Sequence, residues 1–131
     1  MNLEYPTQIK LLEVIDSVEE LENILSTPYT ETIEDLASIK GDIIILGAGG
    51  KIGPSLVLTA IRAINCGDLD KKVIAVSRFT RRDVAEKLRE NGVEVVEADL
   101  SDEKAIENLA GIVNVISMVG VKFGTPVVIC L

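Results

Sequence analysis

Short runs of β-branched residues alternate with helical patterns along most of the chain. Each run holds consecutive apolar residues, which is typical of strands that are buried on both faces of a parallel sheet. This alternation predicts an α/β fold, a doubly wound parallel sheet of about four to five strands with helices on both faces. The expected strands are 43–46, 73–76, 93–96 and 112–116, with 127–131 as a further short segment, and the expected helices are 55–65, 83–91 and 101–110.

Residues 1–40 show a different pattern. Ser17, followed three positions later by Glu20, forms a capping box, which satisfies free backbone N–H groups at the start of a helix. Apolar residues at helical spacing follow until Pro28 interrupts them, and a second helical pattern comes before the first strand. We therefore expect an N-terminal helical extension over 1–40 and a second domain over 41–131.

Composition narrows the classes of function. The chain has 131 residues and a formal net charge of −8, and only 3% of its residues are aromatic. An acidic protein repels phosphate backbones and anionic lipid, and few aromatic rings are present to stack on bases. We therefore expect no nucleic-acid partner and no membrane partner. Since no apolar run approaches the ~20 residues of a membrane span and no signal-peptide pattern is present, we expect a cytoplasmic protein.

Two further counts exclude several kinds of site. The sequence contains no histidine, which excludes the Ser-His-Asp triad, the Cys-His dyad and most catalytic zinc sites. Cys66 and Cys130 are far apart and form no Cys-x-x-Cys motif, the spacing of zinc knuckles and dithiol redox sites. We expect no metal site.

A glycine-rich loop follows the first expected strand and leads into a helix. In such a loop one glycine permits a sharp turn, another permits close approach of a pyrophosphate, and a third lets the helix pack tightly. The helix N-terminus adds free N–H groups and a partial positive charge. A glycine turn that binds nothing is the alternative, and a Walker A loop is excluded because it must end in Gly-Lys-Ser/Thr. The residues expected to bind a dinucleotide are Gly47, Gly49, Gly50, Lys51, Ile52 and Gly53.

The end of the second expected strand favours NADP over NAD. An NAD-specific site carries an acidic residue there, which binds the ribose hydroxyls. This strand ends instead in Ser77 and Arg78, which can hydrogen-bond and pair with a 2′-phosphate. Lys51 adds a cation on the same side, whereas Arg81 and Arg82 have a plainer interpretation as the solvated start of the next helix. Arg78 also disfavours an S-adenosylmethionine site, which usually has the acidic residue as well.

The spacing Gly47-x-x-Gly50-x-x-Gly53 resembles that of the NAD-dependent epimerase/dehydratase family, the extended and atypical short-chain dehydrogenase/reductases. The resemblance spans roughly residues 42–126 and implies a Rossmann-like fold that binds NADP or NAD. Two later segments resemble the family's pair beside the adenine ring and its segment beside the ribose and nicotinamide. These segments are Asp99 and Leu100 for the adenine ring, and Met118, Val119 and Gly120 for the ribose and nicotinamide.

The chain also departs from that family. The family's catalytic pair, Tyr-x-x-x-Lys, is missing, because the only tyrosines, Tyr5 and Tyr29, precede the glycine loop. Family members are also longer than this chain. We therefore expect a truncated cofactor-binding half with no catalytic residues of its own.

Several functions fit these features. The favoured one is the NAD(P)-binding domain of an oxidoreductase related to epimerases, dehydratases and reductases. A second is a non-catalytic regulatory module that senses a dinucleotide, which the N-terminal helices favour. A third is an S-adenosylmethionine-binding, methyltransferase-like domain. An apolar tail at 127–131 would leave an exposed strand edge, which favours association into a homo-oligomer.

Overall fold

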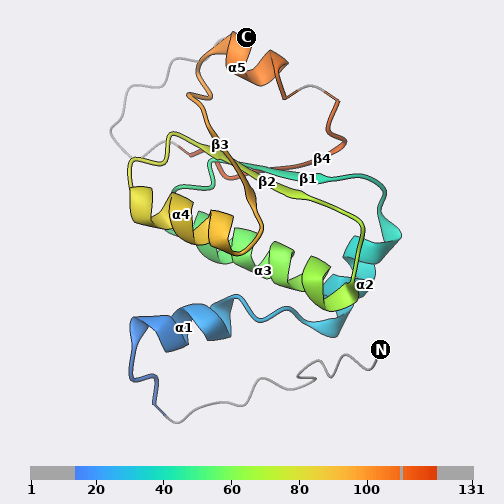
Figure 1. Ribbon diagram of the computed structural model, residues 1–131, viewed down its shortest axis with the longest axis vertical. Coiled ribbons are helices and arrows are strands. Elements are labelled where there is room, and N and C mark those ends of the chain that lie inside the picture. The colour runs from blue at the N-terminus through green and yellow to red at the C-terminus, as the bar shows by residue number, and fades with distance from the viewer. Residues whose placement is uncertain (1–13, 110, 121–131) are drawn as a thin grey trace.

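The computed structural model describes residues 14–109 and 111–120, which form one parallel sheet and its surrounding helices (Figure 1). In chain order the elements are α1 (Val18–Leu25), α2 (Thr30–Ser38), β1 (Ile43–Leu46), α3 (Gly53–Gly67), β2 (Val73–Ser77), α4 (Arg82–Glu90), β3 (Glu94–Glu97), α5 (Glu103–Glu107) and β4 (Asn114–Ser117).

The sheet has the order β3-β2-β1-β4, and every pair of neighbouring strands is parallel. Ile43 of β1 is paired with Val73 of β2 on one side and with Asn114 of β4 on the other. The chain therefore runs outward from β1 to β3 and then returns to the opposite side of β1. Such a reversal is the switch point of a doubly wound fold, where ligands bind beyond the carboxyl ends of the strands. The predicted α/β class and parallel sheet are confirmed.

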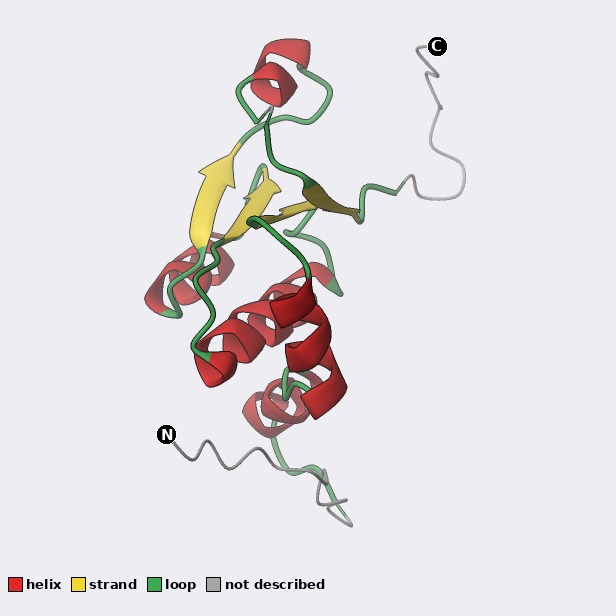
Figure 2. Ribbon diagram, turned by 90° about the vertical axis from the view of Figure 1, so that its right-hand side faces the viewer, coloured by secondary structure: helices red, strands yellow, loops and turns green. Residues whose placement is uncertain are grey.

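Helices cover the two faces of the sheet unequally. Helices α1 to α4 lie on one side of the sheet, whereas α5 lies on the other (Figure 1 and Figure 2). Because side chains alternate along a strand, Ile43 and Ile45 of β1 join the larger core with α3 and α4. Ile44 instead joins Ile74 and Val76 in a smaller core on the second face. Helices therefore lie on both faces, as predicted.

The end of α3 differs from the prediction. The expected helix 55–65 extends further, to Gly67, and Asp68 is its C-cap residue with a left-handed φ of 49°. Gly67 serves packing instead. A Cβ there would lie 2.9 Å from Ile33 Cγ2 and 3.0 Å from Leu69 Cγ, so its absence lets α2 approach α3.

Helix α5 is shorter than the predicted 101–110. Asp102 is its N-cap and accepts a hydrogen bond from the backbone N–H of Lys104 at 3.0 Å. Ser101 lies one position before this cap, and its hydroxyl and backbone N–H both donate to Asp99. Residue 110 and the segment 127–131 lie outside the described residues.

Strand β4 forms one edge of the sheet that the structure describes. Its partner on one side is β1, and the side chains of Val115 and Ile116 are exposed. Met118 follows β4 directly, and its backbone N–H donates to Leu46 O at 2.8 Å. This bond holds the segment after β4 against the end of β1, beside the loop that follows β1.

Candidate functional site

A cavity of about 480 Å³ opens between the loop after β1 and the segment after β4. These two segments leave the carboxyl ends of neighbouring strands at the switch point of the sheet, where a ligand is expected. The cavity thus collects loop residues and two residues of the segment 118–120, which are more than sixty positions apart in the sequence. Its lining consists of Gly47, Gly50, Lys51, Ile52, Gly53, Met118 and Gly120.

Gly47 makes the turn out of β1. Its φ is +76°, a conformation that favours glycine. A Cβ would also lie 3.0 Å from both the carbonyl carbon of Met118 and the nitrogen of Val119. The N–H of Gly47 donates to Val76 O at 2.8 Å, which ties the loop to β2 as well. Gly47 is therefore the glycine of the loop at which the chain makes its sharp turn.

The remaining loop glycines differ in what surrounds them. A Cβ on Gly53 would lie 2.2 Å from Ala48 O, so α3 packs directly on the loop backbone. A Cβ on Gly49 would lie 2.5 Å from Ser77 Oγ, at the end of β2. A Cβ on Gly50 would meet only Gly47 O, at 3.9 Å. Gly50 is therefore the glycine whose missing side chain leaves space in the cavity.

The N-terminus of α3 opens on this cavity without a side-chain cap. Its N-cap residue is Ile52, which cannot accept a hydrogen bond from the first turn, and that turn holds no acidic residue. Pro54 has no N–H, Leu56 N donates to Ile52 O, and the N–H groups of Gly53 and Ser55 have no partner within the helix. The fifteen-residue helix therefore presents free donors and the positive end of its dipole to the cavity.

Two of the arginines near the site are engaged by carboxylates. Arg81 pairs with Asp83 at 2.9 Å, and Arg82 pairs with Glu97 of β3. Both arginines therefore belong to the surface around α4, which agrees with their interpretation as the solvated start of that helix. Asp83 has its pKa lowered, chiefly by the hydrogen bond from Arg81.

Lys51 and Arg78 are the two cations that remain for a ligand. Among residues 14–109 and 111–120, neither forms an ion pair or a hydrogen bond with another side chain. Lys51 lines the cavity, whereas Arg78 is exposed just beyond the end of β2. An anionic ligand that extended from α3 to β2 would meet one cation near each end.

Phe79 was not predicted as part of the site. It has a φ of 45°, rare for a bulky residue, yet its side chain is only 3% exposed. Its ring belongs to the larger core and reaches the loop, since a Cβ on Gly49 would lie 3.6 Å from its Cδ1. The ring therefore anchors the turn that carries Ser77 and Arg78. The only available sequence signal was an aromatic residue within a polar turn.

Asp99 and Leu100 lie outside the lining of the cavity. Asp99 Oδ1 accepts hydrogen bonds from Ser101 Oγ at 2.7 Å and from Ser101 N at 3.0 Å. These bonds, with a smaller contribution from the charge of Arg78, lower the pKa of Asp99. Leu100 packs against the smaller core on the second face. The expected contact of this pair with an adenine ring stays a prediction.

Two other kinds of site find no support in the described part of the chain. Residues 14–109 and 111–120 contain no group of three or more His, Cys, Asp or Glu side chains that could hold a metal ion. Within the same ranges, no helix has the length and apolar character needed to cross a membrane.

The parallel sheet, the glycine loop at its switch point and the open helix N-terminus define a Rossmann-like α/β domain. The chain belongs to the NmrA-like family, whose family model matches residues 39–129. This family has the NAD(P)-binding Rossmann-like fold and is related to the epimerase/dehydratase family that the glycine spacing resembles. Comparisons with curated proteins and with solved structures find no match.

Proposed function

We propose that the loop between β1 and α3 binds the pyrophosphate of NADP or NAD, in an oxidoreductase-like module related to epimerases, dehydratases and reductases. The observation that supports this most directly is the uncapped N-terminus of α3, which opens on the cavity beside Gly50. Backbone N–H groups at a helix N-terminus, together with the helix dipole, form a site that favours phosphate groups.

The residues around the cavity fit the parts of a dinucleotide. The pyrophosphate would accept hydrogen bonds from the first turn of α3 and pair with Lys51. The nicotinamide half would lie toward Met118 and Gly120, and the adenosine half toward the end of β2. A bound nicotinamide would supply hydride transfer, whereas the residues of this chain bind and orient it.

Alanine at Gly50 tests the pyrophosphate site. The added Cβ meets no protein atom closer than 3.9 Å, so the fold should tolerate Gly50→Ala. The methyl group would stand where the pyrophosphate approaches, and we expect dinucleotide affinity to fall by about tenfold or more, about 1.4 kcal/mol. Isothermal titration calorimetry with NADP and NAD measures this loss, and urea denaturation measures stability.

Gly92→Ala is the matched control for Gly50→Ala. Gly92 follows α4, has a φ of +89° and has nothing within 4 Å of its Cβ position. Alanine there should cost about 1 kcal/mol of stability through backbone strain and leave binding unchanged. Unchanged affinity in Gly50→Ala would contradict the pyrophosphate site. Failure of the wild type to bind either dinucleotide at millimolar concentration would contradict the proposed function as a whole.

We further propose that NADP is preferred over NAD, through Ser77 and Arg78. Arg78→Ala should weaken NADP binding by about 10- to 100-fold, because a hydrogen bond to a charged group contributes about 1.5–3 kcal/mol. NAD binding should change little, since NAD has no 2′-phosphate. Arg81→Ala is the matched control, because Arg81 already pairs with Asp83. Equal losses for NADP and NAD in Arg78→Ala would show that Arg78 does not select the 2′-phosphate.

A further inference from the structure

Helix α1 and the residues just before it expose all of their large apolar side chains except that of Ile24, which is half-buried. The exposed fractions are 67% for Val14, 45% for Ile15, 74% for Val18, 39% for Leu21 and 56% for Leu25. No residue of α1 itself is buried. An amphipathic helix ordinarily turns its apolar stripe toward the core. Val18, Leu21 and Leu25 share one face of α1 by their spacing, and with Val14 and Ile15 they form the exposed apolar surface that we call the α1 patch.

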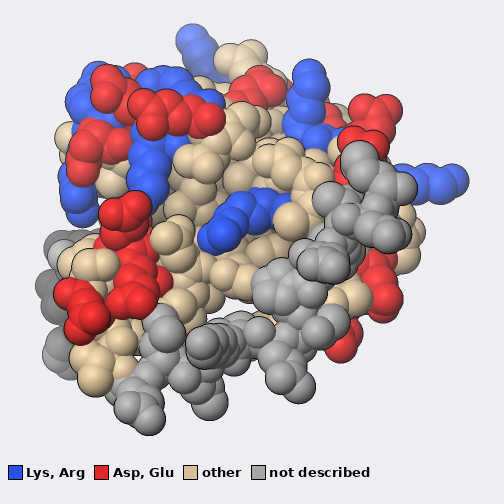
Figure 3. All heavy atoms as spheres, turned by 60° about the horizontal axis from the view of Figure 1, so that its bottom comes forward, with Lys and Arg blue, Asp and Glu red and all other residues tan. Residues whose placement is uncertain are grey.

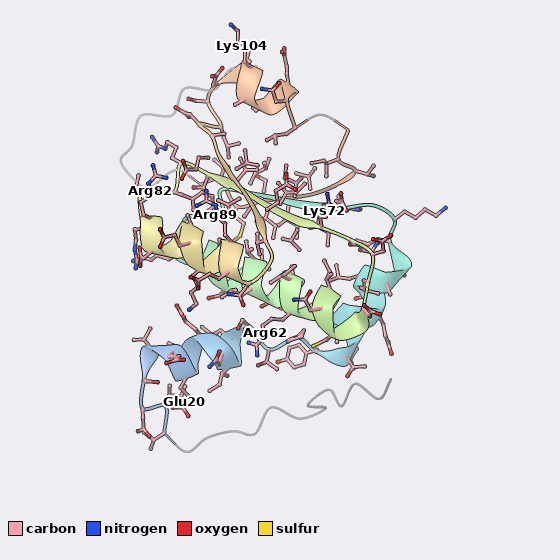
Figure 4. The ribbon with its side chains drawn as sticks, in the orientation of Figure 1. Glu20, Arg62, Lys72, Arg82, Arg89 and Lys104 are labelled. Carbon is pink, nitrogen blue, oxygen red and sulfur yellow. The ribbon has the colours of Figure 1, made fainter. Side chains whose placement is uncertain are left out.

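Polar contacts hold α1 against the rest of the domain. Arg62 of α3 donates from Nη1 to Ser26 Oγ at 2.7 Å and to Asn23 O at 3.2 Å, and Ser26 is only 2% exposed. Figure 4 shows Arg62 reaching from α3 toward the end of α1. Glu22 of α1 also forms an ion pair with Lys87 of α4. Because these contacts use the polar side of α1, they leave the α1 patch exposed.

The segment that carries the α1 patch bears only acidic charges of its own, and one of them, Glu22, is already paired with Lys87. Between residues 14 and 25 the chain carries Asp16, Glu19, Glu20 and Glu22 and no lysine or arginine. Figure 3, which brings the lower part of Figure 1 forward, shows acidic side chains beside uncharged surface in this region. Like charges would oppose the pairing of two α1 helices from two copies, and they would also oppose binding to anionic lipid.

We propose that the α1 patch docks an amphipathic helical segment of another protein, whose apolar side chains are flanked by lysine or arginine. Such a segment would cover the exposed aliphatic residues and complement the acidic flank, as in recognition of a helix by an apolar surface. The proposal does not depend on a dinucleotide, because the α1 patch precedes residue 39, where the family match begins.

A pair of synthetic peptides tests this docking surface. The probe is an eighteen-residue (about five helical turns) amphipathic peptide with leucines at heptad spacing and lysines beside them, and its partner has glutamate in place of each lysine. Fluorescence anisotropy with the full chain should show binding of the lysine peptide alone, weakening as salt is raised. Equal binding of both peptides, or no binding of the lysine peptide, overturns the proposal.

Variants locate the binding on the chain. Val18→Ser with Leu25→Ser removes two exposed side chains and should weaken the lysine peptide by about tenfold or more. Val113→Ser is the matched control, since Val113 is 81% exposed near β4, and it should leave the affinity unchanged. Equal effects of the two changes overturn the proposal. So does a dimer in analytical ultracentrifugation that Val18→Ser with Leu25→Ser dissociates, because the α1 patch would then join two copies.

Discussion

Gly53→Ala should lower the free energy of unfolding by about 3 kcal/mol or more, a large part of the roughly 5–15 kcal/mol that stabilises a typical domain. The new Cβ would lie 2.2 Å from Ala48 O, 2.5 Å from its carbonyl carbon and 2.8 Å from its Cα. These are backbone atoms, so no side chain can rotate to relieve the overlap. Helix α3 would have to move away from the loop, which would disturb its packing on the sheet. Urea denaturation followed by circular dichroism measures the loss.

Gly50→Ala provides the comparison within the same loop. Because a Cβ there meets only Gly47 O at 3.9 Å, its stability should stay within about 0.5 kcal/mol of the wild type. Both variants should lose dinucleotide binding, but only Gly53→Ala should also lose stability. If Gly53→Ala unfolds at the same urea concentration as the wild type, α3 does not approach Ala48 as closely as the structure indicates.

Phe79→Ala should cost about 3–5 kcal/mol of stability, because a buried ring is replaced by a methyl group. Phe79→Gly removes the same ring but also relieves the left-handed φ of 45°. That conformation costs a non-glycine residue about 1–2 kcal/mol, so the glycine variant should be more stable than the alanine variant by about 1 kcal/mol. Paired denaturation curves measure this difference. The reverse order would contradict the backbone conformation at Phe79.

The same position should affect the choice of cofactor. The ring of Phe79 anchors the turn beside Gly49, and Arg78 precedes it on that turn. Phe79→Gly should therefore reduce the ratio of NADP to NAD affinity, whereas Phe79→Leu keeps an apolar anchor and should retain most of the ratio. Calorimetry with both dinucleotides distinguishes the variants. An unchanged ratio in Phe79→Gly would show that Arg78 does not depend on this anchor.

The order and type of the elements were determined by the sequence itself. A parallel strand covered on both faces needs consecutive apolar residues, and Ile43, Ile44 and Ile45 of β1 supply them. The change from this run to glycines and then to a helical pattern located the loop at the switch point. The capping box at Ser17 was also predicted, and Glu20 N donates to Ser17 Oγ at 3.1 Å. These are local properties, since each depends on residues a few positions apart.

Boundaries were less predictable where two local interactions compete. Ser101 and Asp102 are both suitable N-cap residues, but α5 begins after Asp102, and the Ser101 hydroxyl is oriented toward Asp99. Gly67 is a suitable C-cap residue, but it stays helical beside Ile33 of α2. In both cases the sequence contains suitable residues at neighbouring positions, and only the folded backbone selects one of them.

The division of roles within the candidate site was decided by tertiary structure alone. Gly50 faces the cavity while Gly53 packs on Ala48, although both are glycines of one loop. Arg82 is engaged by Glu97, fifteen positions further along the chain, whereas Arg78 has no such partner among the described residues. The sequence by itself determined which elements form and where the glycine-rich loop lies. Only the folded chain decided which atoms surround each residue, because those atoms belong to segments distant in sequence.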